Sequence, residues 1–186
     1  MNNLPERGWN MFAVIALFDK HTEDFIRRIW IELEEHSISS YAFEIENRRP
    51  HITLASYTNL DLEDFISQLD DFYENKPVIP ISFSSVGTFL KTGIIYYSPT
   101  MTSQLYTLHR SHHQHFGLFL ESDSLYSPEQ WIPHCTLANR LSHNQLLAAF
   151  SYCSQQPKLD GKIEAISIIE VTDTGKINTV FTKKLS

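Results

Sequence analysis

The sequence predicts a mixed fold of strands and helices, arranged as two pseudo-equivalent lobes around a shared cleft. The hexapeptide Pro-His-x-Thr-Leu-Ala occurs twice, with its histidines at His51 and His134. Each copy follows a predicted strand and helix and precedes a predicted helix and strand, which indicates an internal duplication. The long period and the small number of copies are unlike those of a solenoid. Because small-molecule sites tend to lie between lobes, we expect each lobe to supply one histidine to the cleft.

In the first half of the chain, the spacing of apolar residues predicts each element in turn. The run at 11–18 is apolar and β-branched, which is typical of a buried strand. From 22 to 35, apolar residues recur at helical spacing between acids and arginines. A short extended run at 41–45 leads to a strand at 51–57 that carries the first motif. An apolar face then predicts a helix at 61–73.

The second half repeats this order of elements. Ser142, with Gln145 three residues later, has the form of a capping box and predicts the start of a helix. In chain order we expect strands at 78–89 and 93–98, a helix at 102–116, the second motif strand at 134–139, a helix at 142–154, and strands at 162–171 and 177–184.

Length and composition indicate one well-packed domain over residues 1–186. No apolar run approaches the roughly 18 residues needed to cross a bilayer, so we expect no membrane span. The N-terminus lacks a basic start followed by an apolar stretch, so we expect no secretory signal. Two cysteines provide no disulfide framework, which favours the reducing cytoplasm. Nothing in the sequence is typical of an obligate dimer, so we expect a monomer.

The balance of charge excludes one class of partner. The formal net charge is −7, with 15 lysines and arginines against 22 acidic residues. An extended nucleic-acid surface needs a basic face that neutralises many phosphates, and this chain is poorly equipped to provide one. A small anionic substrate held by a few local cations remains compatible with the composition.

The repeated motif carries residues suited to proton transfer at phosphorus. A histidine and a threonine two residues apart lie on one face of a strand, because strand side chains alternate. Two such strands place two imidazoles on either side of a small site. One imidazole is then able to take a proton from water while the other gives one to a leaving oxygen. The hydroxyls of Thr53 and Thr136 are able to donate hydrogen bonds to phosphoryl oxygens. This chemistry requires no metal or cofactor.

The paired His-x-Thr-Leu motifs, in a chain of this length and element order, resemble those of the 2H phosphoesterase superfamily. The most similar branch is the 2′-5′ RNA ligase and RNA 2′,3′-cyclic phosphodiesterase group. The resemblance implies a bilobal α+β fold like that of LigT, with antiparallel sheets, outer helices and a central cleft. It also implies metal-independent hydrolysis of cyclic phosphates. By motif match, His51 and His134 are the acid–base pair, and Thr53 and Thr136 bind the phosphate.

The basic residues near the motifs include one departure from the family pattern. Many members have an arginine five residues after the second motif histidine, where this chain has Asn139. Arg140 follows it and matches the parity of His134 in an ideal strand, so we expect Arg140 to bind phosphate. Arg48 and Arg49 precede the first motif, either to steer an anionic substrate or as ordinary loop charges.

Several aromatic residues near the motifs are able to stack on a nucleobase: Tyr57, Phe89, Tyr97 and Trp131. We favour Trp131, which lies three residues before His134, and we retain Tyr57 as a second candidate. Packing in the core is the alternative for each of them, since the chain has many aromatic side chains.

Two further features invite a chemical interpretation that we do not favour. His109 and His113 are four residues apart on a predicted helix, but without acids or cysteines nearby they indicate a solvated helix face rather than a metal site. Cys135 is next to His134, and adjacent strand residues point to opposite faces. We therefore expect Cys135 to be a small core residue and not a nucleophile.

The leading hypothesis is hydrolysis of a nucleoside 2′,3′-cyclic phosphate or a cyclic RNA end. Other phosphodiesters remain open, namely 2′-5′ oligonucleotides, ADP-ribose cyclic phosphate or a cyclic-nucleotide signal. A nucleotide- or RNA-binding module without turnover is an alternative of a different class, and ligation ranks below hydrolysis. The near symmetry of the motifs leaves open which histidine is the acid and which is the base.

Overall fold

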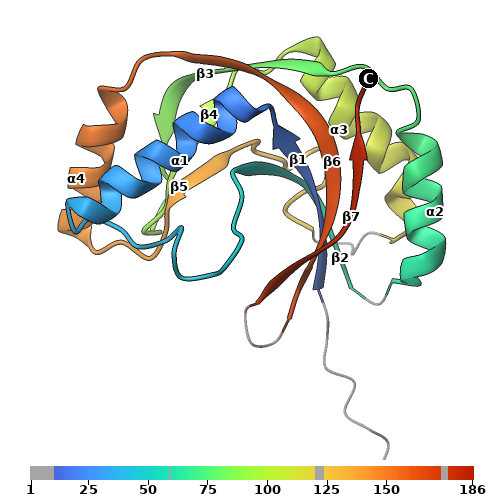
Figure 1. Ribbon diagram of the computed structural model, residues 1–186, viewed down its shortest axis with the longest axis horizontal. Helices are drawn as coiled ribbons and strands as arrows, with labels where there is room; N and C mark the ends of the chain where they lie inside the picture. The colour runs from blue at the N-terminus through green and yellow to red at the C-terminus, as the bar shows by residue number, and fades with distance from the viewer. Residues whose placement is uncertain (1–10, 59, 120–123, 173–175) are drawn as a thin grey trace, which may run out of the picture.

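The computed structural model describes residues 11–58, 60–119, 124–172 and 176–186. Within them the chain forms one antiparallel sheet of seven strands covered by four α-helices (Figure 1). The strands are β1 (Met11–Phe18), β2 (His51–Thr58), β3 (Ile79–Gly87), β4 (Ile95–Pro99), β5 (Cys135–Ala138), β6 (Leu159–Val171) and β7 (Ile177–Lys184). The helices are α1 (Lys20–Glu35), α2 (Leu62–Phe72), α3 (Ser103–Phe116) and α4 (His143–Ser154), with a 3-10 turn η1 (Gly117–Phe119) after α3.

The predicted α+β fold with an antiparallel sheet is confirmed, and one predicted segment is wrong. Residues 41–45 form turns instead of an extended run. Strand β1 pairs with β2 on one edge and with β6 on the other, and this segment joins neither ladder. It packs instead beside α1, where the Tyr41 ring meets the Trp30 ring edge to face. Side-chain packing against α1, and not strand pairing, therefore holds the loop between α1 and β2 in place.

Each helix begins at a side chain that caps its first turn. The N-cap residues Asp19, Asp61, Thr102 and Ser142 each accept a hydrogen bond from a backbone N–H in the first turn. The capping box predicted at Ser142 and Gln145 is present. No helix in the described part of the chain is long and apolar enough to span a membrane.

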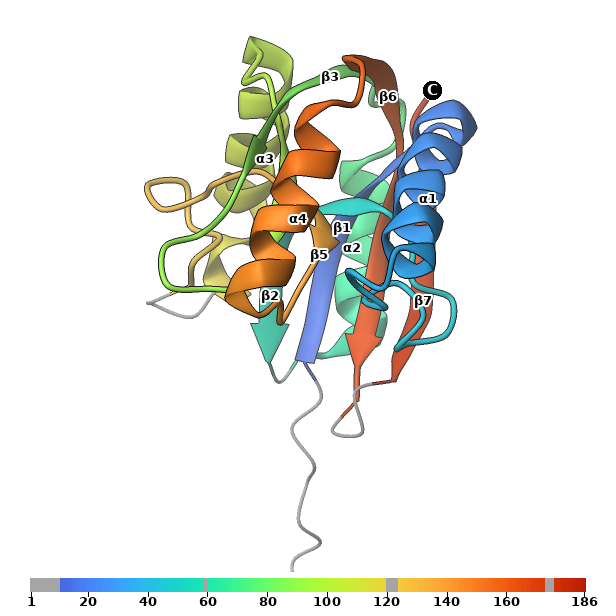
Figure 2. The same cartoon turned by 90° about the vertical axis from the view of Figure 1, so that its left-hand side faces the viewer.

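The order of the strands is β2-β1-β6-β3-β4-β5, and β7 pairs with β6. Strand β6 is 13 residues long, and different parts of it pair with β1 and with β3, so it joins the two halves of the sheet. The sheet curls until its two edges, β2 and β5, contact each other, as the views in Figures 1 and 2 show. These two edges are the strands that carry the repeated motif.

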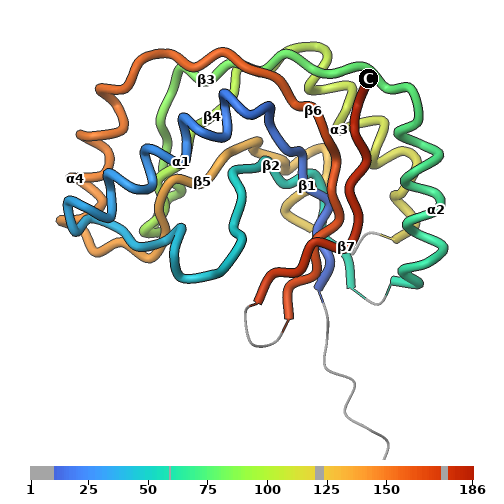
Figure 3. Tube along the Cα trace, viewed as in Figure 1, coloured from blue at the N-terminus to red at the C-terminus, as the bar shows by residue number. Residues whose placement is uncertain are grey.

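Helices α1 and α3 each pack against the motif strand of the other half of the chain. Helix α1 precedes β2 in the chain but packs against β5, while α3 precedes β5 but packs against β2. In Figure 1, α1 and α4 lie at the left around β5, and α2 and α3 lie at the right around β2. The trace in Figure 3 shows the chain crossing between the two sides each time. Each motif strand is therefore supported by a helix from the other half of the sequence.

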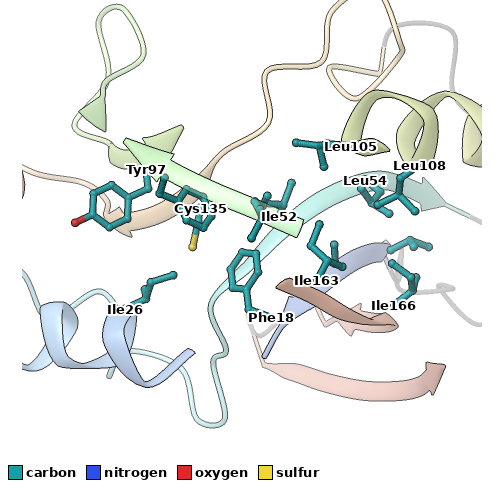
Figure 4. Close-up of a cluster of buried hydrophobic side chains, with 14 of the residues drawn as sticks. Phe18, Ile26, Ile52, Leu54, Tyr97, Leu105, Leu108, Cys135, Ile163 and Ile166 are labelled. Atoms are coloured by element: carbon teal, nitrogen blue, oxygen red, sulfur yellow. The ribbon is translucent and has the colours of Figure 1, made fainter. Parts of the chain in front are cut away.

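The main hydrophobic core lies between the sheet and these helices. On β1, Val14, Ala16 and Phe18 face this core, and their neighbours Ala13, Ile15 and Leu17 face the opposite side of the sheet. Figure 4 shows how side chains from both edges meet in the core, Ile52 and Leu54 from β2 with Cys135 from β5. The core thus fixes the two motif strands on one side, and His51 and His134 are only partly buried on the other.

Candidate active site

Both motif strands carry a β-bulge at the leucine of the motif. On β2, Ala55 pairs with Val14 and Thr53 with Ile15, so Leu54 is an extra residue in the ladder. On β5, Ala138 pairs with Ile95 and Thr136 with Tyr96, so Leu137 is the extra residue. A bulge interrupts the alternation of side chains. Residues beyond each leucine consequently change faces, and this affects two of the residues predicted to bind substrate.

The histidine rings are held in the same way in both motifs. Each Nδ1 lies 2.7 Å from the carbonyl oxygen two residues earlier, that of Arg49 for His51 and that of Ile132 for His134. Because a carbonyl oxygen only accepts, Nδ1 must carry the hydrogen in each bond. In the neutral ring Nε2 is then unprotonated, so the geometry leaves Nε2 to receive a proton.

The two histidines have lowered pKa values. Burial is the main cause for His51, and the positive charges of Arg48 and of a protonated His134 lower its pKa further. Burial also lowers the pKa of His134, against the hydrogen bond to Ile132 that favours the charged ring. The charge of His134 therefore acts on His51, and the guanidinium of Arg48 is a second positive charge that acts on His51.

Each motif threonine is fastened by a tryptophan from the other half of the chain. The indole N–H of Trp131 donates to the carbonyl oxygen of Thr53 at 2.9 Å. The indole N–H of Trp30, on α1, donates to the carbonyl oxygen of Thr136 at 3.3 Å. Because β2 and β5 are edge strands, carbonyl groups on their outer side lack a neighbouring strand. The two indole N–H groups donate hydrogen bonds in place of a neighbouring strand and hold the two threonines in position.

The threonine side chains also have matching partners. Hydrogen bonding with the Thr53 side chain lowers the pKa of the Tyr126 phenol, although burial raises it more. The Thr136 side chain acts in the same way on the phenol of Tyr41, whose pKa burial again raises. Both tyrosines precede the motif of one half and reach the threonine of the other. Sequence spacing gave no sign of these partners, because the helix exchange that brings them together is a property of the fold.

The prediction that the α3 histidines lie on a solvated helix face is wrong. His109, His112 and His113 are buried, with 3%, 0% and 6% of their surfaces exposed. His113 Nε2 donates to the carbonyl oxygen of Leu54 at 2.9 Å, which the bulge leaves outside the β1 ladder. Burial lowers the pKa of all three, that of His109 to about 3. Among the described residues, no group of three or more His, Cys, Asp or Glu side chains is arranged to hold a metal.

Trp131 lies against this histidine layer. Its ring stacks on the His109 ring with centroids 3.7 Å apart and planes 4° apart. His109 Nε2 also donates to the backbone carbonyl of Tyr126 at 2.9 Å. One face of the Trp131 ring is therefore occupied by His109, and its N–H is used by Thr53. The sequence predicts that Trp131 stacks on a nucleobase, and only the other face of its ring is left for such a stack.

Tyr57 corrects a second expectation. It is 1% exposed, and its hydroxyl lies 2.8 Å from Nε2 of the buried His112. The bulge at Leu54 is the reason, because it turns Tyr57 to the core face, opposite to that of His51 and Thr53. Tyr57 has no surface to offer a substrate.

Aromatic side chains do surround His134. The ring centroids of Phe89 and Tyr96 lie 4.9 Å and 5.3 Å from that of His134. Tyr96 passes directly over Gly87, where an added Cβ would meet the tyrosine ring at 2.6 Å. Phe89 was among the sequence candidates, whereas Tyr96 was missed. The strand alternation in Ile95-Tyr96-Tyr97 was the signal available, because one of its two tyrosines had to face the cleft.

The structure separates the arginines near the site. Arg140 follows the bulge at Leu137, so the parity expected for an ideal strand does not apply to it. Its backbone has φ 57°, its side chain is 69% exposed, and its guanidinium pairs with Glu44. Arg49 is held by Glu23. Arg48 lies over the Tyr41 ring, with its guanidinium carbon 3.8 Å from the ring centroid.

Cys135 is buried, as predicted, with 1% of its surface exposed. Its thiol lies against the backbone N–H of His51, on the core side of the two edges, and burial raises its pKa to about 12. A thiol with so high a pKa is poorly suited to act as a nucleophile.

A curled antiparallel sheet whose two edges each present a His-x-Thr pair defines a fold of the 2H phosphoesterase type. The chain belongs to the 2′-5′ RNA ligase superfamily, whose sequence profile matches residues 18–175. No curated protein sequence matches the chain.

Solved structures agree with this assignment at the level of the fold. E. coli LigT in its apo form has a TM-score of 0.62 and 13% identity, with 96% of this chain and 99% of that chain covered. E. coli LigT complexed with 3′-AMP has a TM-score of 0.59 and 12% identity, with coverage of 96% and 99%. The protein TT0787 of Thermus thermophilus has a TM-score of 0.62 and 12% identity, with coverage of 94% and 97%.

Proposed function

We propose that the protein is a metal-independent phosphodiesterase that hydrolyses 2′,3′-cyclic phosphates of nucleotides or RNA ends. The observation that carries the proposal is the pair of histidines at the joined sheet edges, each with Nδ1 engaged and Nε2 available. Family membership supports phosphodiesterase chemistry in general. The solved complex of E. coli LigT with 3′-AMP supports a nucleotide carrying a ribose phosphate as the ligand class.

The proposed reaction is an in-line displacement at phosphorus. Nε2 of one neutral imidazole takes a proton from water, and the water oxygen forms a bond to phosphorus. The bond from phosphorus to one ribose oxygen breaks, and the protonated second imidazole gives its proton to that oxygen. The hydroxyls of Thr53 and Thr136 donate hydrogen bonds to the non-bridging oxygens as charge develops. The product is a nucleoside monophosphate, and proton exchange with solvent restores both imidazoles.

We assign His51 as the base and His134 as the acid. The positive charge of Arg48 acts on His51 and favours its neutral form. Because a protonated His134 also lowers the pKa of His51, the two rings disfavour being charged together. The bound phosphodiester is negative, so it favours a proton on the ring that Arg48 does not influence. The nucleobase then lies on the aromatic side of the cleft, against Phe89 and Tyr96.

We also propose that the protein acts as one domain in the cytoplasm. Strand β6 pairs with both halves of the sheet, which supports a single folding unit. Cys135 and Cys153 are free and buried, which supports a reducing compartment.

The test is hydrolysis of 2′,3′-cyclic AMP in the presence of EDTA. We expect His51→Ala and His134→Ala each to lower kcat by roughly 10²- to 10⁴-fold, the usual contribution of a positioned acid or base. His143→Ala, at an exposed histidine on α4, is the matched control and should retain full activity. Turnover that is unchanged in both motif variants, or that disappears with EDTA, contradicts the proposal. A panel of 2′-5′ dinucleotides and ADP-ribose cyclic phosphate then tests the substrate.

A further inference from the structure

A phosphate bound between the motifs needs a positive group, and three arginines near the cleft are candidates. We propose that Arg48, and not Arg140, is the residue that binds the phosphoryl oxygens of the substrate. The inference deepens the proposed function and rests on it only for the identity of the substrate. Binding of a phosphate group at Arg48 is testable without any turnover.

Arg140 and Arg49 are already neutralised by neighbours. Arg140 pairs with Glu44 and lies beyond the end of β5, with most of its side chain in solvent. Arg49 pairs with Glu23, whose pKa is lowered by its hydrogen bonds to arginine against the effect of burial. An arginine paired with a carboxylate has its charge neutralised and has fewer donors left for a phosphate. Both residues are therefore poor candidates.

Arg48 differs in having no such partner. Across the described residues, no carboxylate forms an ion pair with Arg48. Its Nε is buried and lacks a hydrogen-bond acceptor. Buried polar groups are rarely left unsatisfied, and those that are call for an explanation such as a missing ligand. An anion that accepts a hydrogen bond from this guanidinium would satisfy the buried Nε.

The position of Arg48 links it to both motifs. It lines a small hollow of about 20 Å³ together with His51, Ser167 and Thr179. Its guanidinium carbon lies 3.8 Å from the centroid of the Tyr41 ring, and its charge lowers the pKa of the Tyr41 phenol against the larger effect of burial. Tyr41 in turn contacts the Thr136 side chain. Arg48 thus lies beside the histidine of one half and over the tyrosine whose phenol is influenced by the threonine of the other half.

The shape of the arginine side chain suits this role. A guanidinium presents five N–H donors in one plane and binds phosphate through two parallel hydrogen bonds. Stacking on Tyr41 fixes that plane, which reduces the conformational entropy lost on binding. A lysine at the same position keeps the charge but offers no paired donors. The proposal therefore distinguishes charge from geometry.

The experiment measures binding of inorganic phosphate and of 3′-AMP by calorimetry. Arg48→Gln should weaken both ligands by at least about tenfold, and Arg48→Lys should have an intermediate effect. Arg140→Gln should change either affinity by less than about twofold, as should Arg110→Gln at an exposed site on α3. A larger effect of Arg140→Gln than of Arg48→Gln overturns the proposal. So does a wild-type protein that binds neither ligand.

A second readout separates charge from structural damage. The groups whose charges act on His51 are Arg48 and His134. In the free protein, Arg48→Gln should raise the pKa of His51 measured by NMR, whereas Arg48→Lys should leave it close to the wild-type value. If Arg48→Gln does not fold, the Arg48→Lys affinities decide, because unchanged phosphate binding in that variant excludes the paired hydrogen bonds. Absent hydrolysis with intact phosphate binding contradicts only the proposed function.

Discussion

The two motif regions have the same backbone plan and different surroundings. In both, a bulge at the leucine follows the threonine, Nδ1 of the histidine donates to a carbonyl two residues earlier, and an indole donates to the threonine carbonyl. Around His51, however, lies Arg48, whereas around His134 lie Phe89 and Tyr96. The comparison shows how one repeated strand provides two histidines with different roles, because the neighbours rather than the motif set each environment.

The layers behind the two strands differ as well. Strand β2 is supported by the buried histidines of α3, which contact it through Leu54 and Trp131. Strand β5 is supported by Trp30 and Tyr41 and packs against α1, whereas α3 packs against β2. Each side has a motif histidine with a lowered pKa, and the β2 side has three buried histidines more, so the β2 side should respond more strongly to acid. The predictions below test these similarities and differences, from the largest expected effect to the smallest.

The largest effect should come from the feature that the two halves share. Thr53→Val and Thr136→Val each remove one hydroxyl proposed to stabilise the phosphoryl oxygens. We expect each to lower kcat by roughly 10²- to 10³-fold, as for other donors to developing negative charge. Thr107→Val, at an exposed position on α3, should have no effect. A loss confined to one motif variant would falsify the functional equivalence of the two threonines.

The next effect concerns acid and should be larger on the β2 side. Burial lowers the pKa of His109 to about 3, so the unfolded chain binds more protons than the folded chain between about 6.5 and 3. The contribution of the neutral His109 to the free energy of unfolding should be complete above about pH 6.5, and it should be lost as the pH falls to about 3. Hydrogen exchange at pH 5 should accelerate in α3 and β2 before it does in α1 and β5. Equal acceleration on both sides contradicts the prediction.

A smaller effect should follow from loss of one indole N–H. Trp131→Phe leaves the Thr53 carbonyl without its donor and weakens the stack on His109, and we expect a loss of about 1–3 kcal/mol in unfolding free energy. Trp30→Phe removes a longer hydrogen bond, at 3.3 Å, and should cost less. Urea unfolding of the two variants measures the difference. A larger loss for Trp30→Phe is the contrary outcome.

The smallest effect should be on affinity at the aromatic side. Phe89→Leu keeps an apolar side chain but removes the ring beside His134, so KM for 2′,3′-cyclic AMP should rise by roughly three- to tenfold with kcat almost unchanged. Phe150→Leu, at an exposed site on α4, is the matched control. If KM is unaffected, the nucleobase does not lie on this side of the cleft.

Much of the architecture could be read from the sequence, because periodicity reports local structure directly. The capping box at Ser142 and the burial of Cys135 followed from local rules that the fold obeys. The histidines of α3 were also readable: positions 105, 108, 109, 112, 113 and 116 are all buried and follow helical spacing. Treating histidine as polar concealed that continuous face. This was an error of interpretation rather than a limit of the sequence.

Other features could not be read because they depend on pairing. A bulge depends on the register against the neighbouring strand. The bulge at Leu137 inverts the parity from which Arg140 was predicted, and the bulge at Leu54 turns Tyr57 to the core. The exchange of α1 and α3 between lobes is likewise invisible in a local pattern. Tyr41 and Tyr126 were missed for that reason, since each acts on the other half.

The exchanged helices have a consequence for motion. Domains that close over a substrate need a hinge with few contacts across it, so that one body can rotate against the other. Here each motif strand is tied to the opposite half through Trp30 or Trp131, and β6 runs through both halves without a break. Opening the cleft by rotation would break these ties. We therefore expect a preformed site whose catalytic cycle needs no closure step.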